Sequence, residues 1–321
     1  MTFFSILCAL LIEQFRPLRA NNWVYEGINT FSARMEKWLN AGQERHGRMA
    51  WILTMLALMV PTVLIYGLCD WMGSWFVLGW NVVIVYLTLG FRHYSHYFTS
   101  IQLALHAGDE ATAKTLLAEW TKQDVVEVAG MDVNEVVRVT VEHALMTTHR
   151  HVFGVLFWFL MPLGPACAVM YRVAEHLAHV WNEPDHMKGE SFGYFADRAF
   201  YWIDWIPVRL TAIAFAVVGN FEDAVYAWRN FSHRWKDEAM GIILSSGGGA
   251  MGVRLGAPSQ AAVDVPVTEV LMNEMGAEYI ESQLGELVTV RVLHSTVGLV
   301  WRALLLWMLL LLMLSIAVWL G

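Results

Sequence analysis

Long apolar runs alternate along this chain with polar stretches of similar length. Four runs are read as membrane helices, namely 50–68, 74–91, 152–174 and 297–320. A straight crossing of the bilayer takes about 20 mostly apolar residues, and these runs are close to that length. The pattern therefore predicts an all-α fold, a polytopic integral membrane helical bundle with polar helical segments outside the bilayer.

Two further runs are less clear, and the expected total is about five membrane segments, with 199–219 as the fifth and 2–15 as a partial one. The first, 2–15, is too short for a straight crossing, so a tilted and a re-entrant arrangement both remain open. It lacks the basic start and cleavage site of a signal peptide. The second, 199–219, is long enough but carries Asp204 and Arg209 near its middle. Charges at that depth are costly and are kept mainly when paired or facing a cavity, so a structural ion pair and a functional site both remain open.

The apolar run 152–174 contains Pro162, Gly164 and Pro165. These residues disfavour continuous helix, and a break in mid-membrane is expected there.

The distribution of basic residues predicts the orientation. The loop 16–49 is rich in Arg and Lys, whereas the hairpin turn 69–73 has neither. By the positive-inside rule the loop is cytoplasmic. Counting crossings then places 92–151 and 220–296 on the cytoplasmic side, and 175–198 on the opposite side if the charged run spans.

Composition supports lipid contact and excludes one class of partner. Hydrophobic residues make up 57% and charged residues 16% of the 321 residues, and this apolar excess must face lipid. The 16 Trp and 10 Tyr residues suit the headgroup zone. The net charge of −8, without a basic block, argues against nucleic-acid binding.

A metal site is not expected. The three cysteines share no metal-type spacing, and the histidine pairs His93/His96 and His149/His151 lack a neighbouring carboxylate or cysteine at ligand spacing. Histidines at a membrane interface that bond to headgroups or backbone are the commoner outcome.

The polar segments show helical patterns with clear ends. Gly108-Asp109 is expected to break a helix and cap the next one from about Glu110. Glu142 lies on a later helix that continues toward the bilayer. After the charged run, Gly219-Asn220 should end one helix, with Glu222 and Asp223 in the first turn of the next. Beyond residue 256 a loop and an acidic amphipathic helix are expected.

A glycine cluster, SSGGGAMGVRLG, occupies residues 245–256. Its glycines Gly247, Gly248 and Gly249 would let backbone amides approach a ligand closely, and Arg254 adds an anion donor. It is not a P-loop, because the Lys-Ser/Thr pair is missing. A tight crossing of two backbones is the other interpretation.

Several of these stretches carry a resemblance. The run DWIPVRLTAIAFAVVGNFEDAVYAWR, followed by GGGAMGVRLG, resembles the CobD/CbiB family of membrane proteins of cobalamin biosynthesis. Weaker similarity runs through IQLALHAGDEATAKTLL and through VTVEHALMTTHRHVFGVLFWFLMPLGPACAVMYR. The resemblance implies one membrane domain over residues 1–321.

The resemblance also implies an activity and a site. Members of the family join adenosylcobyric acid to an aminopropanol or its phosphate through an amide, giving adenosylcobinamide or its phosphate. By motif position, the catalytic residues would be Glu142 and Asp204, and the substrate-binding residues Arg209, Gly247, Gly248, Gly249 and Arg254. Expected partners are lipid, a corrinoid and aminopropanol phosphate, with ATP as a candidate cofactor.

A second resemblance keeps an alternative open. Where the CobD/CbiB pattern reads E-N-x-x-D-G, this chain has Met146, Thr147, Arg150 and His151. The stretches MTFFSILCALLIEQF, RHYSHY and DWIPVRL are similar to AmpE-type inner-membrane proteins, which are tied to sensing in β-lactamase induction. A membrane sensor without corrinoid chemistry, or a scaffold without a small ligand, is therefore the alternative.

Overall fold

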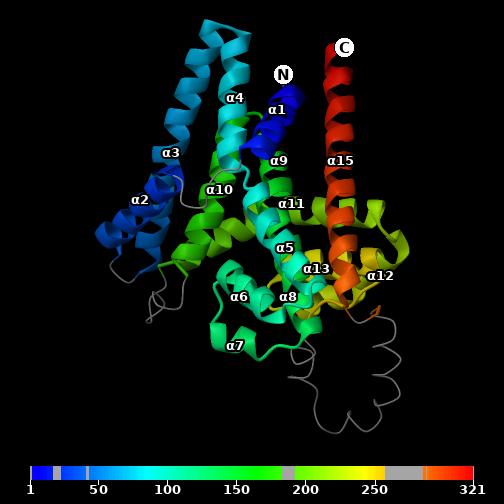
Figure 1. Cartoon of the computed structure of the whole chain (residues 1–321). Helices are drawn as coiled ribbons and strands as arrows, with labels where there is room; N and C mark the ends of the chain where they lie inside the picture. Colours follow the sequence, from blue (N-terminus) through cyan, green and yellow to red (C-terminus); the bar gives the residue numbers. More distant parts are fainter. Residues whose placement is uncertain are drawn as a thin grey trace. The chain divides into compact units, whose positions relative to one another are not determined.

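A computed structural model describes residues 2–16, 23–40, 43–182, 192–256, 285–286 and 288–320, with the side chains of 23–25, 91–94 and 318–320 excepted. The described residues are helical apart from turns and one parallel bridge between Val253 and Glu286 (Figure 1). The predicted all-α fold is thus confirmed. Of the loop and acidic helix expected over 256–296, residues 257–284 and 287 lie outside the described residues. The expected helix does not run unbroken to its end, because residues 285–286 and 288–289 are not helical and α15 begins at Val290.

The chain divides into two compact units. Unit 1 comprises Met1–His93, Arg150–Pro207 and Leu311–Gly321, and unit 2 comprises Tyr94–His149 and Val208–Leu310. The helices α11 (Tyr194–Val218) and α15 (Val290–Leu320) each contribute residues to both units. Each unit is described by itself below.

Unit 1 is built around a hairpin of two apolar helices, α3 (Glu44–Met72) and α4 (Ser74–Thr88). The turn between them is Gly73, whose φ of 122° is a conformation that glycine adopts without strain. Helix α1 (Thr2–Phe15) packs along α4, α2 (Trp23–Leu39) packs on α3, and α10 (Pro165–Val180) contacts both members of the hairpin. This confirms the hairpin that the sequence predicts.

The run 152–174 is interrupted where its prolines and glycine predict. A π-helical turn, η1 (His149–Phe153), continues into α9 (Gly154–Phe159), and α10 starts only at Pro165. The chain reverses direction between α9 and α10. The evidence is that Gly154 on α9 lies directly against the ring of Tyr171 on α10, so closely that a Cβ at Gly154 would overlap that ring. The break is therefore confirmed, and the helices on its two sides, α9 and α10, form a hairpin.

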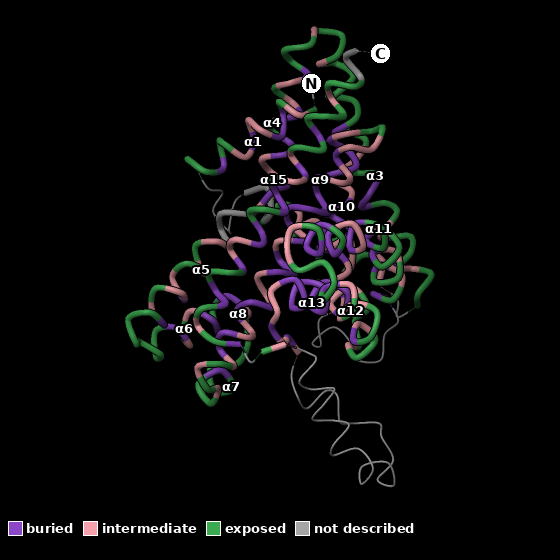
Figure 2. Tube along the Cα trace, turned by 90° about the vertical axis from the view of Figure 1, so that its right-hand side faces the viewer, coloured by how far each residue is buried: buried purple, intermediate pink, exposed green. Residues whose placement is uncertain are grey.

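Unit 2 gathers shorter helices around one buried helix. It contains α5 (Phe91–His106, from Tyr94 on), α6 (Glu110–Thr121), α7 (Val125–Ala129), α8 (Val133–Thr148), α12 (Phe221–Phe231), η2 (Ser232–Arg234) and α13 (Glu238–Met251). Every residue of α13 from Gly241 to Ala250 is buried, which Figure 2 shows as an almost continuous purple segment. The predicted cap of α6 is confirmed, since Asp109 accepts from the Thr112 amide at 3.0 Å. Glu222 and Asp223 lie in the first turn of α12 as predicted, and Asn220 accepts from the Asp223 amide at 3.3 Å.

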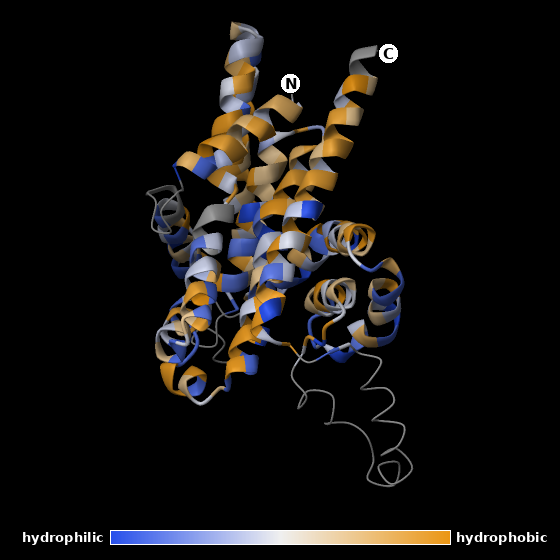
Figure 3. Cartoon of the chain, turned by 45° about the vertical axis from the view of Figure 1, so that its right-hand side comes forward, coloured by the Kyte–Doolittle hydropathy of each residue, from blue (hydrophilic) through white to orange (hydrophobic). Residues whose placement is uncertain are grey.

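Among the described residues, three helices are long and apolar enough to cross a membrane: α3, α11 and α15. The helices α1 and α4 are apolar but shorter. Large apolar side chains are exposed along α3 and α15, for example Leu64, Leu305 and Leu309. Figure 3 shows the C-terminal helix as mainly hydrophobic. An exposed apolar surface of this extent is what a helix facing lipid requires, so the chain is a membrane protein.

Candidate functional site

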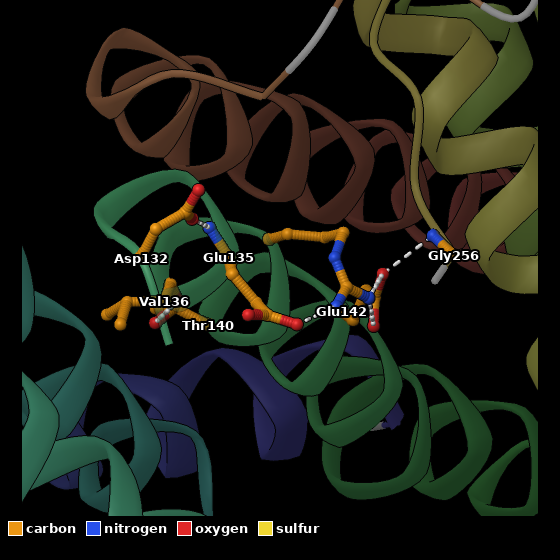
Figure 4. A network of polar contacts seen from close by, with 7 residues as sticks. Asp132, Glu135, Val136, Thr140, Glu142 and Gly256 are labelled. Atoms are coloured by element: carbon orange, nitrogen blue, oxygen red, sulfur yellow. Dashed lines mark hydrogen bonds and ion pairs between the residues drawn. The ribbon is translucent and has the colours of Figure 1, made fainter. Parts of the chain in front are cut away.

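The Glu142 carboxylate is the centre of a buried polar network in unit 2. Glu142 lies on α8 and is 8% exposed. Its Oε1 and Oε2 accept hydrogen bonds from Arg138 Nη1 at 3.1 and 3.3 Å, and Oε1 also accepts from the Gly256 amide at 2.7 Å. Figure 4 shows these contacts, together with the bond that Arg138 makes to Glu135 at 3.2 Å. The bond to Gly256 joins two segments that are 114 residues apart in the sequence.

Local sequence explains why Arg138 and Glu142 meet. The two residues are four apart on one helix, so their side chains lie on the same face. Asp132 caps that helix by accepting from the Glu135 amide at 2.7 Å. A charge-assisted pair that is this well buried stabilises more than an exposed one, because water screens it less.

The segment that follows α13 is held at several points. Gly252 has a φ of 70° and ends the helix, and the Val253 amide donates to Gly248 O at 3.0 Å. The Arg254 amide then donates to Glu286 O at 2.9 Å. Arg254 lies only two residues before Gly256, so the structure brings Arg254 and Glu142 into the same neighbourhood of unit 2.

The three adjacent glycines lie inside helix α13. A Cβ on Gly249 would lie 2.5 Å from the Asp223 carbonyl oxygen of α12, and one on Gly248 would lie 2.8 Å from the Val253 carbonyl oxygen. A Cβ on Gly247 would meet the Leu145 side chain of α8 at 2.8 Å. The glycines therefore permit close backbone packing. Because amides inside a helix already bond within it, the role of Gly247–Gly249 in holding a substrate stays a prediction.

Arg209 is joined to the start of α13. Its Nη2 donates to Glu238 Oε1 at 2.6 Å. Two residues later, Thr211 Oγ1 lies 2.9 Å from His149 Nδ1, and Ser246 donates to Ala212 O at 2.8 Å. The second part of α11 is thus bound by polar contacts inside unit 2 to α13 and to His149, the residue that follows α8.

Asp204 belongs to unit 1 and has different surroundings. It is 2% exposed and accepts a hydrogen bond from the Tyr171 hydroxyl at 2.9 Å. Tyr171 is fully buried against Phe200, over whose ring the Arg150 guanidinium lies at 5.9 Å. The bond to Tyr171 connects α10 to α11 within this unit.

The residues that the sequence did not single out are Arg138, Tyr171, Thr211 and Glu238. Arg138 could have been found from its spacing to Glu142, since oppositely charged side chains four apart on a helix pair readily. The others contact partners from 29 to 62 residues away in the sequence, so no local signal was available. Among the described side chains, no group of three or more His, Cys, Asp or Glu residues is arranged to hold a metal ion.

Comparison with known proteins gives a consistent result. The family model described as "CobD/Cbib protein" matches residues 6–285. A "Cobalamin biosynthesis protein CobD" from Stutzerimonas stutzeri is 29% identical over 262 residues, which cover 79% of this chain and 82% of that protein. A protein of the same name from Chromobacterium violaceum is 31% identical over 54% of each chain.

The second resemblance is also found, over a smaller part of the chain. "Protein AmpE" from Shigella flexneri is 28% identical over 42% of this chain and 46% of its own length. No solved structure matches the chain.

Proposed function

The chain belongs to the CobD/Cbib family, and from this premise we propose that it acts in cobalamin biosynthesis. The proposed reaction forms an amide between the free carboxyl group of adenosylcobyric acid and the amine of an aminopropanol or its phosphate. The product is adenosylcobinamide or its phosphate. The proposed location is a bacterial inner membrane, with 92–151 and 220–296 on the cytoplasmic side.

One observation carries the proposal. The Glu142 carboxylate holds the Gly256 amide at 2.7 Å, which fixes the segment carrying Arg254 beside α8. Arg209 is bound to α13, the helix from which that segment continues. Three of the residues expected from the family pattern therefore belong to one unit and are linked through α13.

The charges suit the proposed substrates. A guanidinium donates paired hydrogen bonds to phosphate and also bonds to amide oxygens, so Arg209 and Arg254 would hold the aminopropanol phosphate and the propionamide groups of the corrinoid. A substrate group that binds the Arg209 guanidinium would compete with the Glu238 carboxylate for it. Because Glu238 is the first residue of α13, substrate binding would change the contacts of that helix. The side chain of Glu238 is 45% exposed, so exchanging this partner costs little desolvation.

The proposed role of Glu142 is to accept the proton that the amine loses when its nitrogen attacks the carboxyl carbon. A carboxylate offers about four acceptor positions, and the bonds from Arg138 and Gly256 use three of them. The carboxyl group must be activated before the attack, and ATP is the proposed co-substrate that phosphorylates it, so that phosphate leaves as the C–N bond forms. Asp204, in unit 1, is a proposed catalytic residue through its family position alone.

Complementation tests the proposal. A strain lacking its own CobD/CbiB protein, supplied with cobyric acid, should grow without added cobinamide when it expresses this chain. Arg209→Ala and Arg254→Ala should abolish this rescue. Arg291→Ala, an exposed cation at the start of α15 and outside the matched residues, should leave it intact. Membrane levels of each variant are measured by immunoblot.

Failure of the intact chain to rescue growth at normal membrane levels would refute the proposal. The AmpE-like alternative predicts that outcome, together with a changed induction of β-lactamase when the gene is deleted.

A further inference from the structure

We infer that the chain from α9 to α11 enters the bilayer from one side and returns to that side. In this arrangement α9 and α10 form a re-entrant hairpin, and the exposed aromatic face of α11 lies in the lipid headgroup layer. The inference concerns the membrane surface of the protein and stands independently of the proposed reaction.

The first argument is the shape of the hairpin. From His149 to Phe159 the chain enters the bilayer as η1 followed by α9. These 11 residues span roughly 16 Å, about half of the ~30 Å hydrocarbon core. The contact between Gly154 and Tyr171 shows that α10 then runs back along α9.

The turn of the hairpin is suited to an apolar surrounding. The amides of Leu160 and Met161 donate to carbonyl groups of α9 at 3.1 Å each, the Gly164 amide donates to Met161 O at 2.7 Å, and Pro162 has no amide hydrogen. A turn with most of its donors satisfied by its own segment can lie at membrane depth. Leu163, 53% exposed at this turn, supplies an apolar tip.

The second argument is where the chain emerges from α10. His176 Nε2 lies 3.4 Å from Ser32 Oγ on α2. After the end of α10, the Phe192 carbonyl lies directly against Gly47, and the ring of Phe195 meets Trp51 at 5.6 Å. Gly47 and Trp51 belong to the first turns of α3, beside Arg45 and Arg48. All of these contacts lie within unit 1.

These contacts fix the side of the membrane. The first turns of α3 continue from the segment 16–49, and α3 crosses from there to the turn at Gly73. Residues 175–182 and 192–198 therefore lie on the same side as 23–40 and 43–49, contrary to the expectation from counting crossings, which had placed 175–198 on the opposite side.

The third argument is the depth of α11. Arg209, in the middle of this helix, bonds to Glu238 at 2.6 Å. Glu238 is the first residue of α13 and follows a stretch of exposed polar side chains that includes Arg234, Lys236 and Asp237. A polar, exposed stretch of this kind belongs in water or among headgroups, because placing it in the hydrocarbon core is too costly. The middle of α11 must lie at the same level.

The exposed side of α11 has the composition of a surface that contacts headgroups. Tyr194, Tyr201, Trp202 and Trp205 are exposed on it, with Trp202 at 63%, and Figure 2 shows the alternation of exposed and buried residues along the helix. These aromatic residues extend over about 16 Å of helix. In a helix that stands across the membrane, Trp and Tyr gather at the two ends. A series of aromatic residues from one end to the middle, with the exposed Asp197 and Arg198 between Tyr194 and Tyr201, fits a helix that lies in the interface.

Cysteine accessibility tests the inference. In a chain with Cys8→Ala, Cys69→Ala and Cys167→Ala, single cysteines are placed at exposed positions, as Asp70→Cys, Glu110→Cys, His179→Cys, Asp197→Cys and Glu222→Cys. An impermeant maleimide is then applied to intact cells and to permeabilised cells. A cysteine can react in intact cells, or it can react only after permeabilisation. We expect Asp70→Cys to show one of these two labelling patterns and the other four variants to share the other.

Two results would overturn the inference. If His179→Cys or Asp197→Cys follows Asp70→Cys, the hairpin crosses the membrane. If Glu222→Cys differs from Asp197→Cys, α11 crosses it. If the cysteine-free chain does not accumulate, the same five cysteines are placed in the chain that keeps its three native cysteines. Peptide mapping then identifies which cysteine carries the maleimide, and the same comparison is made.

A depth measurement provides an independent test. A fluorophore is attached at Tyr201→Cys, Ile206→Cys, Ile213→Cys or Val217→Cys and quenched by shallow or deep nitroxide lipids in vesicles. These positions extend over about 24 Å of helix, yet we expect one shallow depth for all of them. Leu163→Cys and Leu309→Cys should report deeper positions. A depth that changes steadily from 201 to 217, or a shallow Leu163→Cys, would contradict the inference.

Discussion

At the scale of single residues, Glu142 shows how burial changes the value of an ion pair. Arg138 bonds to two carboxylates at similar distances, but the side chain of Glu142 is 11% exposed and that of Glu135 is 45% exposed. Replacing Glu142 with alanine leaves Arg138 and the Gly256 amide without this acceptor. We expect Glu142→Ala to lower the free energy of unfolding in detergent by about 1–3 kcal/mol. Glu135→Ala, the matched control, should cost less than about 1 kcal/mol. Equal costs would show that the bond to Gly256 contributes nothing.

Gly249 is a residue whose missing side chain matters. A Cβ there would lie 2.5 Å from a backbone oxygen of α12, which cannot move as a side-chain end can. We expect Gly249→Ala to destabilise the chain by about 1–3 kcal/mol, because the two helices must separate. Gly67→Ala is the control, since nothing lies within 4 Å of its Cβ position and alanine favours helix. Thermal unfolding in detergent distinguishes them, and a neutral Gly249→Ala would refute the close crossing.

At the scale of elements, capping shows where short-range sequence is sufficient. Asp109 accepts from both the amide and the hydroxyl of Thr112, at 3.0 and 2.6 Å. These hydrogen bonds lower the pKa of Asp109 below its ordinary value. Because the folded-state pKa is the lower one, the stabilisation is present above the unfolded-state pKa and is lost as pH falls through the folded-state pKa. We expect Asp109→Ala to speed amide exchange in α6 at pH 7, with the difference from the native chain disappearing in acid.

Asp109→Asn is the control for this cap, because asparagine also caps helices but does not titrate in this range. It should keep α6 protected at both pH values. Equal exchange in all three chains at pH 7 would contradict the cap.

The α9–α10 hairpin and α11 are joined by the Tyr171 hydroxyl. Tyr171→Phe removes a buried donor and leaves Asp204 short of one hydrogen bond. We expect a cost of about 1–3 kcal/mol in the free energy of unfolding. Tyr194→Phe, at an exposed position, should have little effect. If both variants unfold alike, the bond between Tyr171 and Asp204 does not stabilise unit 1.

The same elements show what sequence reasoning could reach. The α3–α4 hairpin, the caps of α6 and α12 and the break after α9 follow from apolar runs, Gly, Pro and Asn, which act on their nearest neighbours. The direction of α10 does not, because it depends on contacts of Tyr171, His176 and Phe192 with distant segments. Hydropathy measures how apolar a run is, and it does not report whether the run crosses or returns.

At the scale of the whole molecule, the candidate site shows the same difference between what the sequence predicts and what depends on contacts between distant segments. Family motifs gave Glu142, Arg209 and Arg254 their expected roles, and the structure places all three in unit 2. Asp204 received its expected role in the same way but lies in unit 1. The partners of these residues, such as Glu238 and Tyr171, were missed because they come from other elements. Motif position identifies residues, whereas their grouping requires the fold.

Ligand binding by the intact chain gives the last prediction. A ligand that binds only the folded state raises the free energy of unfolding by about 2.7 kcal/mol at a concentration one hundred times its Kd. We expect adenosylcobyric acid to raise the melting temperature of the detergent-purified chain. Arg254→Ala should lose this shift, because it removes a guanidinium from the proposed site, whereas Arg291→Ala should keep it. A shift retained by Arg254→Ala would place the corrinoid elsewhere, and no shift in any chain would favour the AmpE-like alternative over corrinoid chemistry.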